Sequence, residues 1–144
     1  MSRLMSAAAA ALCAAFLVLT AAPAHGSTSG GFVAAINGAR ARQGRAALVS
    51  RTDLSRIALR HAQQMAKANS LHHNPGLTRQ VTNWNAVAEN VGVGGNISTL
   101  HQAFMRSRSH RANILDRQYT EIGVGVAVDA RGVLWVAEVF RRPT

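Results

Sequence analysis

The chain has 144 residues, of which 16 are basic and six acidic, and its formal net charge is +10. This length suits one domain, and even a processed form of about 118 residues can bury a hydrophobic core. A surface with this excess of positive charge is attracted to anionic polymers and membrane headgroups. Nucleic acid is the weaker prediction for a partner, because only 5% of the residues are aromatic and few can stack on bases.

The N-terminus has the pattern of an export signal. Arg3 supplies the positive start, and residues 7–19 form an apolar run that is too short for a membrane span. Small residues follow, and we expect cleavage after Gly26, which leaves residues 27–144 as a single domain secreted to the extracellular space or the periplasm. The alternative, a retained N-terminal anchor, is disfavoured by the polar, glycine-rich residues 27–31.

Processing at this position changes both the redox chemistry and the charge of the mature chain. The only cysteine, Cys13, lies in the leader, so the mature protein has no internal disulfide and depends on packing for its stability. Without Arg3, fifteen basic and six acidic residues remain, a net charge of +9, and fourteen of the fifteen are arginines. We expect a monomer without a transmembrane span.

Two amphipathic helices are predicted at the start of the mature chain. The first begins at Gly31 and ends near Gly44, with apolar residues at helical spacing. The second has Thr52 as its N-cap and runs to about Ser70. His61 lies on the apolar stripe of this second helix, which is more typical of a packed histidine than of a functional one.

Histidines and one carboxylate dominate the middle of the chain. His72 and His73 come just before Pro75-Gly76, a pair that ends the helix in a turn. Residues 77–85 are polar and are predicted to form a surface loop. Glu89 follows between apolar neighbours, where a carboxylate is costly to bury unless it is paired. We therefore expect Glu89 to have a partner.

A further helix and a histidine precede the C-terminal strands. Asn96 can cap a helix whose apolar face contains Ile97, Leu100 and Phe104. His110 follows among three arginines, which form either a solvated positive face or a binding patch; they are Arg106, Arg108 and Arg111.

From Glu121 the hydrophobic period changes to two, which indicates a strand. Its large residues alternate with the small residues Gly123, Gly125 and Ala127, and so small a face lets a helix approach closely. A hairpin turn at 129–132 leads to a partner strand over 133–140, and residues 141–144 are expected in solvent. Helices and a small sheet together predict an α+β fold.

Six segments in order resemble the CAP superfamily, which comprises cysteine-rich secretory proteins, antigen 5 and plant pathogenesis-related proteins, also called SCP-domain proteins. The similarity covers essentially the whole mature chain and is greatest to the compact bacterial branch. The segments are Asn37-Gly-Ala-Arg-Ala-Arg-Gln-Gly44, Leu71-His-His-Asn74, Ala88-Glu-Asn-Val91, Ser109-His-Arg-Ala-Asn-Ile-Leu115, Tyr119-Thr-Glu-Ile-Gly-Val-Gly-Val126 and Trp135-Val-Ala-Glu-Val-Phe140.

The resemblance implies an α-β-α sandwich with helices packed on a small antiparallel sheet and a central cleft lined by histidines and glutamates. His73 matches the first cleft histidine, with His72 as a fallback. Glu89 matches the glutamate of the Glu-Asn motif, and His110 matches the second histidine. The family's second glutamate is missing from the helix before His110, and Glu121 is a candidate to replace it.

Two neutral imidazoles across a cleft can bind a divalent metal such as zinc and leave positions open for water. Glu89 could orient a histidine or accept a proton from bound water. The alternative is structural, with Glu89 and His110 forming a buried polar pair.

Three functions are consistent with these features. The first is a secreted binding protein whose His/Glu cleft binds a divalent metal and a small or lipidic ligand, the lipid being implied by the resemblance alone. The second is a metal-dependent hydrolase or peptidase with His73, Glu89 and His110 as catalytic residues. The third is an arginine-rich protein that adheres to anionic cell-envelope polymers or headgroups, with the cleft unused.

Overall fold

The structure, a computed structural model, describes residues 25–144. Residues 1–24, and with them nearly all of the predicted signal peptide, lie outside the described residues. The elements in chain order are α1 (His25–Arg42), β1 (Val49–Ser50), α2 (Thr52–Ala68), α3 (Leu77–Gln80), β2 (Trp84–Gly94), α4 (Ile97–Arg106), α5 (Arg108–Leu115), β3 (Glu121–Val128) and β4 (Leu134–Pro143). Among these helices, none combines the length and the apolar character needed to cross a membrane.

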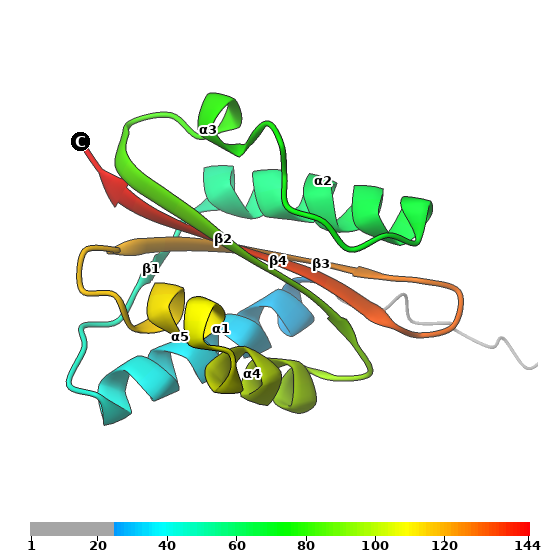
Figure 1. The fold of residues 1–144 in the computed structure, drawn as a ribbon, viewed down its shortest axis with the longest axis horizontal. Coiled ribbons are helices and arrows are strands. Elements are labelled where there is room, and N and C mark those ends of the chain that lie inside the picture. Colours follow the sequence, from blue (N-terminus) through cyan, green and yellow to red (C-terminus); the bar gives the residue numbers. More distant parts are fainter. Residues whose placement is uncertain (1–24) are drawn as a thin grey trace, which may run out of the picture.

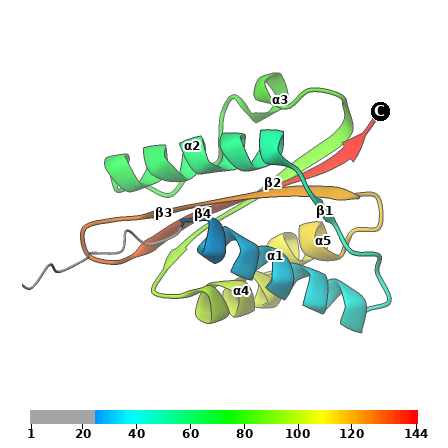
Figure 2. The same ribbon diagram turned by 180° about the vertical axis from the view of Figure 1, so that it is seen from behind.

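The strands form one sheet in the order β1-β3-β4-β2, with helices on both faces. Figures 1 and 2 show α2 and α3 on one face and α1, α4 and α5 on the other. The predicted α+β sandwich is thereby confirmed. The sheet is mixed rather than antiparallel, because the short β1 pairs parallel to β3, with Val49 opposite Glu121. This order makes β2 an edge strand, which matters for the site described below.

The small face of β3 lies directly against α2, as the alternation of large and small residues predicts. A Cβ atom added to Gly125 would overlap the backbone at Ala58 and Leu59, and one added to Gly123 would overlap the backbone at Leu54. Only glycine allows the helix to pack this closely on the strand.

Two hydrophobic clusters lie on either side of the sheet. The cluster beneath α1, α4 and α5 includes Phe32, Ile36, Phe104, Ile114 and Phe140. The cluster beneath α2 includes Leu54, Ala58, Met65, Trp135 and Val139. The apolar stripes predicted for the helices are therefore the faces that the fold buries.

Two predicted helix starts are wrong. The helix α1 begins six residues before the expected start at Gly31. A Cβ at Gly31 would lie 2.7 Å from Cδ1 of Ile97, so this glycine sits at the contact between α1 and α4, where packing outweighs its low helix propensity. The N-cap of α2 is Arg51 rather than Thr52, because the Arg51 amide still donates to the Ile122 carbonyl of the sheet.

The segment 77–85 is not entirely a loop. Four of its residues form α3, and β2 already begins at Trp84, opposite Pro143 of β4. The strand starts this early because β4 is longer than its apolar run suggests. Pairing extends both strands into sequence that is polar.

The C-terminal prediction is wrong at Arg141, which is buried. Its guanidinium bonds Glu121, and its Nη1 lies 2.8 Å from Oδ2 of Asp53 at the start of α2. Although burial opposes it, hydrogen bonds to Glu121 and Asp53 raise the pKa of Arg141. A charged pair of this kind ties the end of β4 to α2 and keeps the chain end in the sheet.

Candidate functional site

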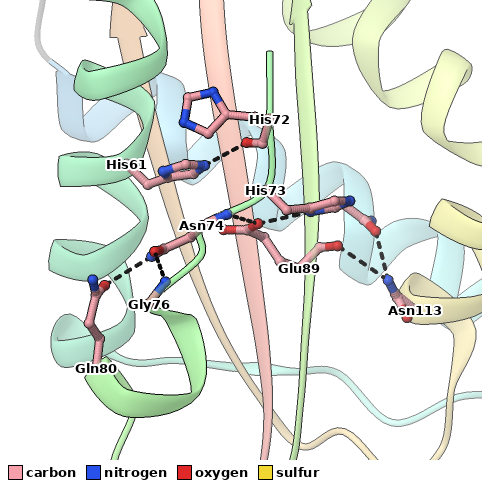
Figure 3. A network of polar contacts seen from close by, with 9 residues as sticks. His61, His72, His73, Asn74, Gly76, Gln80, Glu89 and Asn113 are labelled. Atoms are coloured by element: carbon pink, nitrogen blue, oxygen red, sulfur yellow. Dashed lines mark hydrogen bonds and ion pairs between the residues drawn. The ribbon is translucent and has the colours of Figure 1, made fainter. Parts of the chain in front are cut away.

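A histidine and a glutamate meet between the turn after α2 and the edge strand β2. Oε1 of Glu89 accepts a hydrogen bond from Nδ1 of His73 at 2.9 Å and another from the amide of Asn74 at 2.9 Å (Figure 3). The Glu89 side chain is only 3% exposed, whereas that of His73 is 67% exposed. Glu89 therefore has the partner that its apolar surroundings require.

This bond determines which nitrogen of His73 is free. A carboxylate is an acceptor only, so Nδ1 of His73 carries the proton in this contact. Nε2 is left with its lone pair, on a side chain that is largely exposed. A carboxylate behind a histidine fixes the orientation and the tautomer of the ring, which is the usual arrangement behind a metal-ligating histidine.

Local hydrogen bonds hold the turn that carries His73. The Asn74 side chain accepts from the Gly76 amide at 2.9 Å and donates to Oε1 of Gln80 at 2.9 Å. Figure 3 shows these contacts on the α3 side of Glu89. The Pro-Gly turn predicted from the sequence is therefore fixed to α3.

The other two histidines of this region have supporting positions. Nε2 of the buried His61 donates to the His72 carbonyl at 2.7 Å, so His61 is the packed helix histidine that its position predicts. Nδ1 of His72 lies 3.0 Å from the Ser70 carbonyl, and its ring packs edge-on against His61 rather than pointing to Glu89 (Figure 3). His72 belongs to the turn and not to the contact with Glu89.

The opposite face of β2 is bonded to α5, which carries His110. Asn90 follows Glu89 and so points to the other side of the strand. Its Nδ2 donates to the His110 carbonyl at 3.2 Å, and its Oδ1 accepts from Nδ2 of Asn113 at 2.9 Å. Asn113 Nδ2 also lies 3.5 Å from the Glu89 carbonyl. These bonds fix the position of α5 relative to Glu89.

His110 itself is half-buried and packs edge-on against Phe104, with 5.0 Å between ring centroids. Burial, and next the charge that His73 has when it is protonated, lower the pKa of His110. Neutral imidazole is the form that binds metals. His73 lies on the turn after α2 and His110 on α5, so the two histidines belong to elements on opposite faces of the sheet.

A second buried carboxylate, Glu138 of β4, completes the network behind this site. Its Oε2 accepts from Nδ2 of Asn90 at 2.9 Å, and within the described part of the chain its Oε1 has no hydrogen-bond partner. Burial raises the pKa of Glu138 to about 8, against the opposing effect of the Asn90 bond. Glu138 is therefore largely protonated at neutral pH.

Sequence reasoning missed Asn90, Asn113 and Glu138. Two signals in the sequence could have found Asn113 and Glu138. Asn113 lies three residues after His110 and so shares its helix face. Glu138 is a lone carboxylate between apolar residues, the same signal that identified Glu89.

Two predicted roles are not supported by the contacts. Glu121 bonds Arg141 and lies 3.4 Å from Nε of Arg51, so its carboxylate pairs with these two arginines at the start of β3. The structural pairing of Glu89 with His110 does not form, because Glu89 bonds His73 instead.

The donor set sets a limit on metal binding. Over residues 25–144 no group of three or more His, Cys, Asp or Glu side chains lies close enough together to hold a metal ion. His73 and His110 can supply two imidazoles, and among the described residues the buried Oε2 of Glu89 has no hydrogen-bond partner. These residues do not form a closed metal site, and they fit at most an open one in which water or a ligand completes the coordination.

Two hollows lie away from these histidines. One, of about 380 Å³, is lined mainly by apolar surface between α1, α2 and β3, including Val33, Leu59 and Val124. The other, of about 280 Å³, lies at the end of α1 and is lined by three arginines, Arg40, Arg45 and Arg117.

Comparison with known proteins identifies the family. The model of the CAP family, the cysteine-rich secretory protein family, matches residues 33–139, so the chain belongs to the CAP family. A search of curated proteins finds no significant match.

Solved structures share this fold at low sequence identity. An outer surface protein from Borrelia burgdorferi is 15% identical with a TM-score of 0.72, and the match covers 78% of this chain and 90% of that one. An extracellular SCP-domain protein from Bacillus anthracis is 22% identical with a TM-score of 0.72, covering 82% of this chain and 41% of that one. NaASP2, crystallised with Zn²⁺, is 10% identical with a TM-score of 0.64, covering 80% and 79%. The chain thus spans less than half of the B. anthracis protein.

Proposed function

We propose that this CAP protein acts outside the cell and binds a divalent metal such as zinc through His73 and His110. The observation that carries the proposal is the hydrogen bond from Nδ1 of His73 to Glu89, which leaves Nε2 free on an exposed ring. The lowered pKa of His110 supports it, because that ring is neutral at neutral pH. The export pattern of residues 1–26 and the surface or extracellular descriptions of two structural relatives support the location.

In this proposal each residue has a separate task. His73 and His110 are ligands, and Glu89 holds the His73 ring and fixes its tautomer. Asn90 and Asn113 keep α5, and therefore His110, beside the edge strand. A bound metal would act as a Lewis acid toward water or a ligand. Two protein ligands make a weak site, and the Zn²⁺ in the NaASP2 crystal supports zinc as the first metal to test.

The small or lipidic ligand stays a prediction, supported by the apolar hollow beside Val33 and Leu59.

A metal-dependent hydrolase or peptidase is the alternative function. It would use the same His73, Glu89 and His110, but the second glutamate of the family is missing and Glu121 is bonded elsewhere. A single acid that already orients a histidine supports binding better than it supports catalysis.

Zinc titration tests the metal site. A ligand that binds only the folded protein raises the melting temperature as its concentration increases. We expect zinc to raise the melting temperature of the wild type and to have little effect on His73→Ala or His110→Ala.

The control is His72→Ala, which removes an exposed neighbouring histidine and should respond like the wild type. Equal responses in all four proteins would exclude the site. Cleavage of a peptide library by the zinc-loaded wild type would favour the hydrolase.

A further inference from the structure

The arginine-lined hollow is at the C-terminal end of α1, and its lining residues do not include His73 or His110. Its wall comes from the C-terminal end of α1, the following loop at 44–47 and the segment between α5 and β3. Figures 1 and 2 both place the end of α1 and this segment at the same end of the molecule. The lining is polar, with Arg40, Arg45, Arg117 and Thr120 among the residues that form it.

Arg40 is a fixed cation at this hollow. Its side chain is almost fully buried, with 2% of the residue exposed. The guanidinium donates to four backbone carbonyls, those of Ala46 at 2.7 Å, Ile114 at 2.8 Å, Asp116 at 2.9 Å and Tyr119 at 3.3 Å. Burial and then the charge of Arg45 lower the pKa of Arg40, and the charge of Asp116 opposes this. The group stays charged, since guanidinium does not lose its proton in proteins.

Within residues 25–144, Arg45 and Arg117 have side-chain N–H groups that make no hydrogen bond. Nε of Arg45 donates to the Leu115 carbonyl at 3.1 Å, which together with the Arg40 bonds caps the C-terminal end of α5. Capping accounts for these contacts, but not for the terminal nitrogens of Arg45 or for Arg117. Among the described residues, none of the three arginines has a carboxylate within ion-pair distance.

The acidic residues of the chain are engaged elsewhere. Asp53 and Glu121 bond Arg141, Asp129 bonds Arg131, Glu89 bonds His73, and Glu138 is buried beside Asn90. Asp116 is the one acid that influences Arg40, and its oxygens accept from the Gln118 amide and side chain. Three arginines and one aspartate give the hollow a local charge of about +2, and a concave site concentrates that potential.

We infer that this hollow binds a phosphate group, carried by free phosphate or by a phosphate ester such as a lipid headgroup. Guanidinium groups match the spacing of two oxygens of a phosphate and bind it through paired, charge-assisted hydrogen bonds. Arg40 already uses four of its five N–H donors on carbonyls, so it contributes fixed positive charge, and Arg45 and Arg117 supply the donors for the anion. This phosphate site does not involve His73 or His110. It assigns a binding role to three of the arginines that make the chain so basic.

Titration with inorganic phosphate, followed by NMR of backbone amides, tests this inference. In the wild type we expect saturable shifts of the loop amides at 44–47. The double variant Arg45→Gln/Arg117→Gln should weaken phosphate binding by about tenfold or more. Arg117→Gln alone should weaken phosphate binding less. Because Arg117 is exposed, this single variant should fold normally, so it keeps the test valid if the double variant folds poorly.

The matched control is Arg60→Gln/Lys67→Gln, which removes the same number of charges from exposed positions of α2. We expect its phosphate affinity to stay within about twofold of the wild type. Equal weakening in both double variants, or no saturable shift in the wild type, would overturn the inference. Vesicles with and without phosphatidylglycerol identify the source. Binding that depends on Arg45 and Arg117 indicates a headgroup, whereas phosphate binding without vesicle binding indicates a free phosphate.

Discussion

Glu89 and Glu138 are two buried carboxylates with opposite roles. Glu89 accepts two hydrogen bonds on one oxygen, one of them from the exposed His73. Glu138 accepts one bond, from Asn90, and its pKa is raised by burial to about 8. The first therefore acts as a charged support for a histidine, and the second acts as a neutral acid in the core.

The raised pKa of Glu138 predicts a specific pH dependence of stability. The carboxyl of Glu138 in the unfolded chain has a pKa of about 4.3, so the unfolded state ionises first as the pH rises. The contribution of Glu138 to the free energy of unfolding is therefore largest below this pKa. It decreases as the pH rises toward about 8 and is constant above that pH. Glu138→Gln removes the ionisation. We expect the free energy of unfolding, measured with urea, to increase in the variant by at least about 1 kcal/mol relative to the wild type as the pH is raised from 5 to 8.

Asp129→Asn is the control for this measurement. Asp129 is bonded to Arg131, first among the groups that hold its pKa far below the tested range, so its removal should leave the slope between pH 5 and pH 8 unchanged. A Glu138→Gln variant with the same slope as wild type would mean that Glu138 is ionised in the folded protein.

For single residues, the sequence indicated which side chains need a polar partner, but it did not identify that partner. Glu89 was recognised as needing a partner, but the sequence did not show whether this partner was His73 or His110. The choice depends on a turn fixed by Asn74 and on the position of β2 at the sheet edge, both of which are tertiary features. Glu138 carried the same signal as Glu89 and was missed.

At the scale of elements, the packing of α2 on β3 depends on the two glycines of the strand. In Gly125→Ala the new methyl group would overlap the α2 backbone, which cannot move without separating from the sheet. We expect the free energy of unfolding, measured by urea titration, to fall by about 2–4 kcal/mol.

Gly30→Ala in α1 is the matched control, because a Cβ there meets nothing within 4 Å. Alanine is the better helix former, so this variant should be stabilised by up to about 1 kcal/mol. A loss of less than about 0.5 kcal/mol in Gly125→Ala would contradict the close packing.

The elements that the sequence predicted well are those with a clear period. The alternation over 121–128 indicated a strand and the face that a helix covers, and Asn96 caps α4 by accepting from the Thr99 amide at 2.9 Å. Polar segments were less predictable. The parts of β2 and β4 near Trp84 and Arg141 are ordered by strand pairing and by the bonds of Arg141, neither of which leaves a local pattern in the sequence.

At the scale of the molecule, the two candidate sites are built from different strands and connections of the sheet. The edge strand β2 lies between His73 and His110, whereas the arginine hollow is formed where the chain passes from α1 to β1 and from α5 to β3. The resemblance to the CAP family predicted the layers correctly. The parallel pairing of β1 with β3 was not predicted, because a strand of two residues is too short to show a period.

We propose that His73 and His110 bind one metal ion together, and nitrogen NMR of the histidine rings tests this joint binding most directly. When one equivalent of zinc is added, we predict that Nε2 of His73 and one ring nitrogen of His110 shift in parallel. Nδ1 of His73 should keep its proton against Glu89, and the signals of His61 and His72 should not move. Shifts confined to His72, or a response of only one of the two proposed ligands, would contradict the claim.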